Sequence, residues 1–202
     1  MKKDFMYLAS ASPRRYALLE QIGVPFQARP AQVCEARRPG ELPDAYVTRL
    51  AREKADTVWD EVAAGEARPV LGADTAVVID DQVFGKPRDA EEALQMLADL
   101  SGRTHRVLTA VAVRHGPRLL SELSSSEVRF RETTERERVA YVATGEPLDK
   151  AGSYAIQGMG AVFIDHISGS YSAVMGLPLA MTALLLAEFG VPTWLHTNAK
   201  PA

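Results

Sequence analysis

The fold is decided by one stretch, Val70-Leu71-Gly72-Ala73-Asp74-Thr75-Ala76-Val77-Val78-Ile79-Asp80-Asp81-Gln82-Val83-Phe84. Its apolar runs at 70–71 and 76–79 predict a strand, and Asp80-Asp81 predicts a turn into a second strand at Val83-Phe84. The two strands therefore form a hairpin. Asp74 interrupts the apolar strand, and a carboxylate is unfavourable there unless it lies at the mouth of a cleft or binds something.

Strands and helices alternate on both sides of this hairpin. Further strands are predicted at Phe5–Ala9, Arg106–Val113, Leu119–Phe130 and Ala161–Ile167. Helices are predicted at Pro13–Ile22, Asp44–Ala64, Asp89–Gly102, Thr134–Gly145 and Pro178–Phe189. This alternation predicts the α/β class. Because adjacent strands form hairpins, we expect a mixed central sheet flanked by helices and not a purely parallel sheet.

The chain length bounds the number of domains. Its 202 residues, 47% of them hydrophobic, suit one large domain or two closely joined lobes with a real core. No internal repeat or low-complexity linker divides the sequence. We therefore predict a single two-lobed domain over residues 1–190 and a frayed C-terminal tail over residues 191–202.

Charge and cysteine content exclude several classes of function. The formal net charge is -3, so no basic excess indicates a nucleic-acid polymer, and an anionic ligand must meet local cations. The single cysteine, Cys34, excludes an internal disulfide and a cysteine-built metal site, and it fits a reducing compartment. The apolar stretch after Met1-Lys2-Lys3 is too short for a secretory signal, and the run from Met175 to Ala187 is too short to span a membrane. We expect a cytoplasmic protein without a membrane partner.

The segment Ser10-Ala11-Ser12-Pro13-Arg14-Arg15 predicts a phosphate site. Ser12 suits the N-cap of a helix and Pro13 its first position, so free N–H groups and the positive end of the helix dipole lie there. Arg14 and Arg15 follow in the first turn, where the dipole disfavours cations. The two arginines are either forked donors to a triphosphate or solvated residues of a surface helix.

The motif Gly72-Ala73-Asp74-Thr75 has a chemical and an ordinary interpretation. Chemically, Asp74 could act as a general base or help to hold a hydrated Mg²⁺, which usually takes one or two carboxylates plus substrate phosphates. The ordinary alternative is a turn aspartate after Gly72.

Three other charged residues are equally ambiguous from the sequence alone. Lys54 shares the apolar stripe of its helix with Leu50 and Val58, so its ammonium either reaches into a cleft or extends to the edge of the core. Lys86 is displayed on an extended loop before a proline, where an ordinary loop lysine also fits. Glu35 lies in a loop that supports either interpretation.

Taken in order, these segments resemble the Maf family, the septum-formation-inhibitor-like proteins. The resemblance extends from Leu8 to about Gly190. Its most specific motifs are Leu8-Ala9-Ser10-Ala11-Ser12-Pro13-Arg14-Arg15, Gly72-Ala73-Asp74-Thr75 and Gly85-Lys86-Pro87. Further matches are Leu100-Ser101-Gly102, Gly145-Glu146-Pro147-Leu148-Asp149-Lys150-Ala151-Gly152, Ile156-Gln157-Gly158, Gly169-Ser170-Tyr171 and Gly176-Leu177-Pro178-Leu179. Each motif is short, but so many in one order are hard to obtain by chance.

This resemblance implies a fold and an activity. The fold would be an elongated, two-lobed Maf/ITPase-like α/β architecture with a cleft, and the protein would be a homodimer. The activity would be that of a hydrolase that cuts nucleoside triphosphates to the monophosphate and pyrophosphate with a divalent cation, Mg²⁺ or Mn²⁺. No covalent nucleophile is required, since charge neutralisation on the triphosphate and a base-activated water suffice.

The resemblance also implies roles for individual residues. Asp74 would be the proton acceptor and, together with Glu35, a metal ligand. Lys54 and Lys86 would complete the catalytic set by holding the triphosphate. The substrate-binding residues would be Ser10, Ser12, Arg14, Arg15, Thr75 and Gln157. Cys34 departs from the family pattern, because an acid is expected immediately before Glu35, and this weakens a two-carboxylate role for that loop.

The substrate is predicted from two positions. Thr75 follows the aspartate where another branch of the family has glutamine, and Ile156-Gln157-Gly158 is intact, as in the branch that acts on dTTP and UTP. The physiological pyrimidine nucleotide would be normal or modified. Two alternatives stay open: a pyrophosphatase for a modified purine nucleotide, and a nucleotide-binding regulator of cell division without turnover.

Overall fold

The computed structural model describes residues 5–194, and these form a mixed seven-stranded sheet. The strands are β1 (Met6–Leu8), β2 (Phe26–Ala28), β3 (Val70–Ile79), β4 (Gln82–Phe84), β5 (Thr104–His115), β6 (Arg118–Phe130) and β7 (Ile164–Ser168). Their order is β2-β1-β3-β5-β6-β7, with β4 paired to β3. Strand β1 is parallel to β2 and β3, and every other pairing is antiparallel. The predicted mixed α/β sheet is confirmed.

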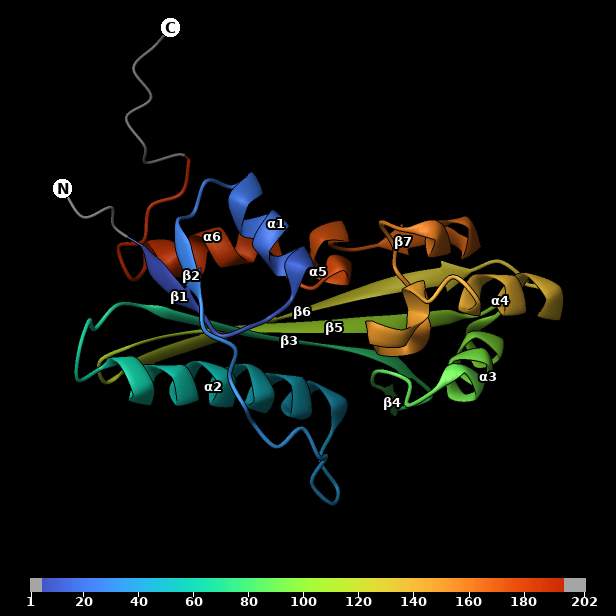
Figure 1. The fold of residues 1–202 in the computed structure, drawn as a ribbon, viewed down its shortest axis with the longest axis horizontal. Coiled ribbons are helices and arrows are strands. Elements are labelled where there is room, and N and C mark those ends of the chain that lie inside the picture. The colour runs from blue at the N-terminus through green and yellow to red at the C-terminus, as the bar shows by residue number, and fades with distance from the viewer. Residues whose placement is uncertain (1–4, 195–202) are drawn as a thin grey trace, which may run out of the picture.

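The helices cover both faces of this sheet (Figure 1). They are α1 (Pro13–Gln21), α2 (Pro43–Val62), α3 (Ala90–Leu100), α4 (Glu135–Val142), α5 (Tyr171–Met175) and α6 (Leu179–Ala187). Helix α2 runs along one face of the long strands, and α1, α5 and α6 lie over the other (Figure 1). Helices α3 and α4 pack together at the end of the sheet far from the described termini (Figure 1). None of the described helices is both long and apolar enough to cross a membrane.

Successive residues of β3 point to opposite faces of the sheet. Ala73 belongs to the apolar cluster that contains the buried leucines of α1, whereas Ala76 belongs to the cluster that contains the buried alanines of α2. By this alternation Asp74 faces α2 and Thr75 faces α1. Two neighbouring polar residues of one strand are therefore presented to different helices.

Gly72 brings β3 very close to α2. A Cβ atom at this position would lie 2.2 Å from the Ala51 carbonyl oxygen and 2.7 Å from the Ala55 nitrogen. Both are backbone atoms, so the helix can approach the strand this closely only where the strand has no side chain. Lys54 lies on the same turns of α2, and this contact therefore sets its distance from Asp74.

Side chains cap the starts of α4 and α3 in different ways. Thr134 Oγ1 accepts the N–H of Glu137 at 3.3 Å, and Glu137 Oε2 accepts the N–H of Thr134 at 2.7 Å, which completes a capping box. Asp89 Oδ1 accepts the N–H of Glu92 at 2.8 Å, although the Glu92 side chain returns to the N–H of Arg88. The start of α1 differs and forms part of the site described below.

Three segments differ from the prediction. The strand expected from Ala161 begins only at Ile164, because Met159–Phe163 form a 3-10 helix. Strand β2 and helix α5 were not predicted, since three and five residues are too few to show a period.

The predicted frayed tail begins with residues that are packed. Val191 and Thr193 are buried, and the N–H of Trp194 donates to the Ile22 carbonyl at 2.9 Å. These contacts tie the end of the described chain to the end of α1. Residues 195–202 of the predicted tail lie outside the described residues.

We predict that Gly72→Ala destabilises the fold by about 1–3 kcal/mol, because α2 must move away from β3 to admit the methyl group. Gly65→Ala is the matched control, since its Cβ would meet only the Val62 carbonyl at 3.8 Å. The measurement is the free energy of unfolding in denaturant for both variants. Equal stability of the two variants would contradict the close contact at Gly72.

Candidate active site

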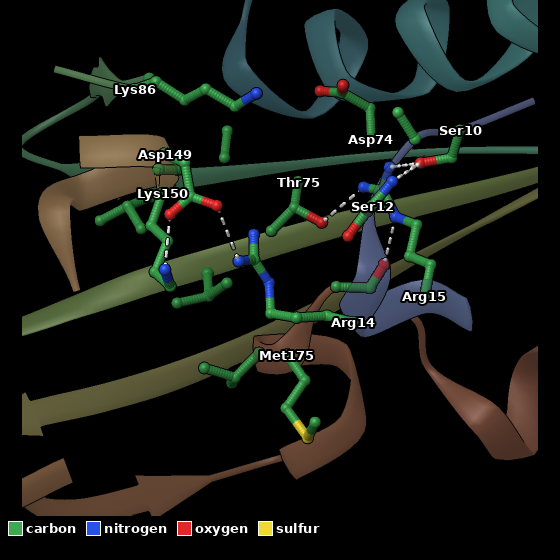
Figure 2. Close-up of a pocket in the computed structure, with 18 of the residues that line it drawn as sticks. Ser10, Ser12, Arg14, Arg15, Asp74, Thr75, Lys86, Asp149, Lys150 and Met175 are labelled. Carbon is green, nitrogen blue, oxygen red and sulfur yellow. Dashed lines mark hydrogen bonds and ion pairs between the residues drawn. The ribbon is translucent and has the colours of Figure 1, made fainter. Parts of the chain in front are cut away.

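One cavity of about 400 Å³ collects every side chain that the sequence predicted to bind or act. It is bounded by the start of α1, by α2, by β3 and by the segment 149–157. Figure 2 shows several of these side chains converging from separate elements. The predicted residues in its lining are Ser10, Ser12, Glu35, Lys54, Asp74, Thr75, Lys86, Arg14, Arg15 and Gln157.

The start of α1 is not capped as predicted. Ser12 occupies the N-cap position, but its side chain makes no capping hydrogen bond. Its own N–H donates to Ser10 Oγ at 3.2 Å, so the serine pair forms a tight turn before the helix. Among the described residues no side chain accepts the N–H groups of Arg14 and Arg15, and such a helix start suits a phosphate.

Arg15 is fixed by the protein and is not a solvated surface residue. Its Nε donates to the Gly176 carbonyl at 2.9 Å, its Nη1 to Ser10 Oγ at 3.1 Å and its Nη2 to Thr75 Oγ1 at 3.3 Å. A guanidinium has five N–H donors, so two remain for a ligand. Burial lowers the pKa of Arg15, but a guanidinium stays charged in proteins.

The hydroxyl of Thr75 belongs to a hydrogen-bond chain whose direction is fixed. Thr109 Oγ1 donates its one proton to the Ala173 carbonyl at 2.7 Å. At the 3.0 Å contact between the two threonines, Thr109 must therefore accept the proton of Thr75. Thr75 then accepts from Arg15, and in this arrangement it has no proton left to donate to a nucleobase.

Arg14 is the freer of the two arginines. Its Nη1 lies 3.7 Å from Asp149 Oδ2, and Figure 2 shows the guanidinium pointing across the cavity to that carboxylate. The Asp149 side chain is 67% exposed, and an ion pair this long and this open to water is weak. Arg14 can therefore turn to an anionic ligand at little cost.

Lys54 joins the two predicted acids. Its Nζ lies 2.7 Å from Asp74 Oδ1 and 2.8 Å from Glu35 Oε1. The side chain is 11% exposed, and its helix neighbours Leu50 and Val58 are buried. Of the two interpretations of Lys54, the structure shows the one in which the ammonium reaches into the cavity.

The two acids have opposite pKa shifts. Burial raises the pKa of Asp74, and the opposing charge and hydrogen bond of Lys54 do not cancel the rise. Burial also raises the pKa of Glu35, but the hydrogen bond and charge of Lys54, helped by Lys86, bring it below its usual value. Burial thus favours the protonated form of Asp74, while the neighbouring cations favour the anionic form of Glu35.

Asp74 and Glu35 also fit a divalent cation. Each contacts Lys54 Nζ through one carboxylate oxygen and keeps a second oxygen, and this second oxygen would have to bind the cation because the ammonium occupies the point where the first oxygens meet. Within residues 5–194 no group of three or more histidine, cysteine, aspartate or glutamate side chains is placed to hold a metal. A cation bound here would therefore need phosphate oxygens and water, as Mg²⁺ commonly does.

Lys86 and Gln157 lie on the other walls of the cavity, and both side chains are exposed. Figure 2 shows the ammonium of Lys86 directed toward the carboxylate of Asp74. Among the described residues the carboxamide of Gln157 has no hydrogen-bond partner, so its donors and acceptor are available to a ligand.

The sequence interpretation missed several residues of the cavity. Tyr46 donates its hydroxyl to the Glu35 carbonyl at 2.9 Å and thereby holds the loop that carries this acid. Lys150 lines the cavity and donates to the Glu146 carbonyl at 2.7 Å. Asp149 faces Arg14. Asp149 and Lys150 lie in one of the motifs that carry the family resemblance, but the motif does not show that their side chains point into the cavity.

The fold and the cavity define a class: a mixed-sheet α/β protein whose cationic cleft surrounds an aspartate of raised pKa and suits a phosphate-rich ligand. A family model described as Maf-like protein matches residues 5–189. The chain therefore belongs to the Maf family.

Several curated relatives match over most of their length. The dTTP/UTP pyrophosphatase of Chromobacterium violaceum is 51% identical over 187 residues, which are 92% of this chain and 94% of that protein. The dTTP/UTP pyrophosphatase of Saccharophagus degradans is 51% identical over 191 residues, 94% of this chain and 90% of that protein. The protein of that name from Escherichia coli O157:H7 is 51% identical over 184 residues, 91% and 92% of the two chains.

Among solved structures, the Staphylococcus aureus Ham1 protein aligns over 81% of each chain with a TM-score of 0.46 and 10% identity. This likeness is too low to bear on the site.

We predict that Lys54→Met raises the pKa of both Asp74 and Glu35. Removal of the ammonium leaves burial without its main opposing charge, so the neutral acids are favoured. Lys86→Met is the matched control, since Lys86 lowers the pKa of Glu35 less than Lys54 does and is not among the main influences on the pKa of Asp74. Carboxyl ¹³C chemical shifts followed through a pH titration measure both groups. An unchanged pKa for Asp74 in Lys54→Met would contradict the ion pair.

Proposed function

We propose that the protein hydrolyses dTTP and UTP to the nucleoside monophosphate and pyrophosphate. The proposal is supported mainly by the Lys54–Asp74 pair, 2.7 Å apart, in a cavity that also contains Arg14, Arg15 and Lys86. It is also supported by relatives named dTTP/UTP pyrophosphatase that are 51% identical over more than nine-tenths of the chain.

Asp74 is the group that accepts the proton of the attacking water. Its Oδ1 is held by Lys54, whereas among the described residues no donor binds its second oxygen, which is free to bind water. Water attacks the α-phosphorus, its oxygen forms the new P–O bond, and Asp74 takes the proton. The α–β bridging bond then breaks, and its electrons leave with pyrophosphate. A raised pKa makes Asp74 a better base near neutral pH than an ordinary aspartate.

The cations of the cavity neutralise the triphosphate. Arg14 exchanges its weak pair with Asp149 for a phosphate oxygen. Arg15 offers its two remaining donors beside the open N–H groups of α1, and Lys86 approaches from the opposite wall. Prearranged charges of this kind stabilise the charge that develops on the leaving pyrophosphate.

A divalent cation, Mg²⁺ or Mn²⁺, is part of the proposal. Asp74 and Glu35 would hold it, and when bound it would supply further neutralisation of phosphate charge. The cytoplasmic location and the homodimer stay predictions from the sequence. So does the choice between a normal and a modified pyrimidine nucleotide as the physiological substrate.

Asp74→Asn is expected to lower kcat by roughly 10²–10⁴-fold and to leave triphosphate binding largely in place. The amide keeps the shape of the side chain but cannot take the proton. The measurement is pyrophosphate release from dTTP with Mg²⁺ or Mn²⁺, together with binding of a nonhydrolysable triphosphate. A folded variant that kept most of its kcat would remove Asp74 from this role.

The base preference depends, in this proposal, on Gln157. Its carboxamide can match the N3–H donor and a carbonyl acceptor of uracil or thymine, and a site built for one edge rejects bases that lack it. We expect kcat/KM for dTTP and UTP to lie far above that for ATP or GTP. We also expect Gln157→Ala to lower the ratio of kcat/KM for dTTP or UTP to that for CTP. A wild-type preference for purine triphosphates would contradict the proposed pyrimidine substrates but would be consistent with the proposed pyrophosphatase activity.

A further inference from the structure

The loop that carries Gln157 is tied to the body of the protein on its N-terminal side through Tyr141. The N–H of Ala155 donates to the Tyr141 hydroxyl at 3.1 Å. That hydroxyl in turn donates to Glu146 Oε1 at 2.7 Å. Tyr141 is buried in α4, so this side of the loop is fixed to a rigid element.

The C-terminal side of the loop is bound to the same carboxylate. The N–H of Met159 donates to Glu146 Oε2 at 3.0 Å, and the N–H of Gly160 donates to Glu146 Oε1 at 3.1 Å. The carboxylate also lies against the backbone of Gly158, where a Cβ atom would come within 2.3 Å of Oε2. Both ends of the segment around Gln157 therefore meet at one side chain.

Each atom of this network has a defined role. Burial, and then the hydrogen bond to Glu146, raises the pKa of Tyr141, which keeps its proton for donation. Glu146 is half-buried, but its hydrogen bonds from Tyr141 and from the loop bring its pKa below the usual value, so it stays an acceptor. The carboxamide of Gln157 has no partner among the described residues, so its position depends on the backbone that these groups hold.

We propose that Glu146 and Tyr141 are positioning residues for base choice, because they fix the backbone from which Gln157 reaches the nucleobase. The inference rests on the proposed function, in which Gln157 contacts the base. Displacement of a contacting group by about 1 Å is enough to lose much of its effect. Neither residue needs to touch the nucleotide.

The test substitutes Glu146→Gln. The amide nitrogen is a donor, so in either orientation it opposes at least one of the three donors that the carboxylate accepts. We expect the ratio of kcat/KM for dTTP to that for CTP to fall roughly tenfold, the size of effect that one charged hydrogen bond provides. Tyr141→Phe keeps the hydrogen bonds from the Met159 and Gly160 N–H groups to Glu146 and removes the hydroxyl that bridges Ala155 and Glu146, so we expect a smaller fall.

Glu137→Gln is the matched control. Glu137 also accepts a backbone N–H, that of Thr134, but it caps α4 and has no contact with the cavity. A purely structural effect lowers the activity on every nucleotide alike and leaves the ratio unchanged, as we expect for this control. The double variant Glu146→Gln/Gln157→Ala should show the same ratio as Gln157→Ala alone, because Glu146 acts through Gln157.

The outcomes separate this inference from the proposed function. If Gln157→Ala changes the ratio and folded Glu146→Gln and Tyr141→Phe do not, the positioning role is wrong and the proposed function is intact. If Gln157→Ala leaves the ratio unchanged, the contact with the base and the inference both fail. If the wild type releases no pyrophosphate from dTTP, the proposed function fails. Should Glu146→Gln not fold, Tyr141→Phe decides the question.

Discussion

The ion pair between Lys54 and Asp74 is the interaction on which the rest of the site depends. The aspartate lies within a central strand, where a lone charge would be strongly unfavourable. It is tolerated there because α2 crosses the strand at Gly72 closely enough for the lysine to reach it. The same ammonium holds Glu35 from a separate loop. One close helix–strand contact thus brings together an aspartate, a lysine and a glutamate from three segments of the chain.

The alternation of the strand divides the site into two functions. On the α2 side, Asp74 meets Lys54 and, through it, Glu35. On the α1 side, Thr75 meets Arg15 and, through Thr109, the backbone of α5. Adjacent residues of one strand are therefore enough to place the proposed proton acceptor and the threonine that anchors Arg15 on opposite faces of the sheet. This is a direct result of the period of two in a β-strand.

Much of this could be predicted from the sequence, because the decisive elements are long and periodic. The β3–β4 hairpin and α2 have enough residues to show their periods, and the unfavourable position of Asp74 was visible as a charge in an apolar strand. The resemblance to a family then indicated which side chains converge, and the structure brings all of them to one cavity.

The rest depends on relative placement, which no local pattern encodes. Nothing in the order of residues shows that Thr75 gives its proton to Thr109, or that Lys54 lies between two acids. Short elements such as β2 and α5 have too few residues to show a period. The network around Glu146 was not predicted for a further reason: two of its three donors are backbone N–H groups, which nearly every residue type supplies.

The hydrogen bond from Arg15 to the Gly176 carbonyl affects when the site can form during synthesis of the protein. It joins residues 161 positions apart, and the strand that carries Thr75 lies between them in sequence. Contacts with such large sequence separation form late, because the intervening chain must first be ordered. A chain still being synthesised cannot form this Arg15 hydrogen bond until the segment after α5 has emerged from the ribosome. The full set of three Arg15 hydrogen bonds is therefore absent from incomplete chains and forms only when nearly the whole polypeptide is present.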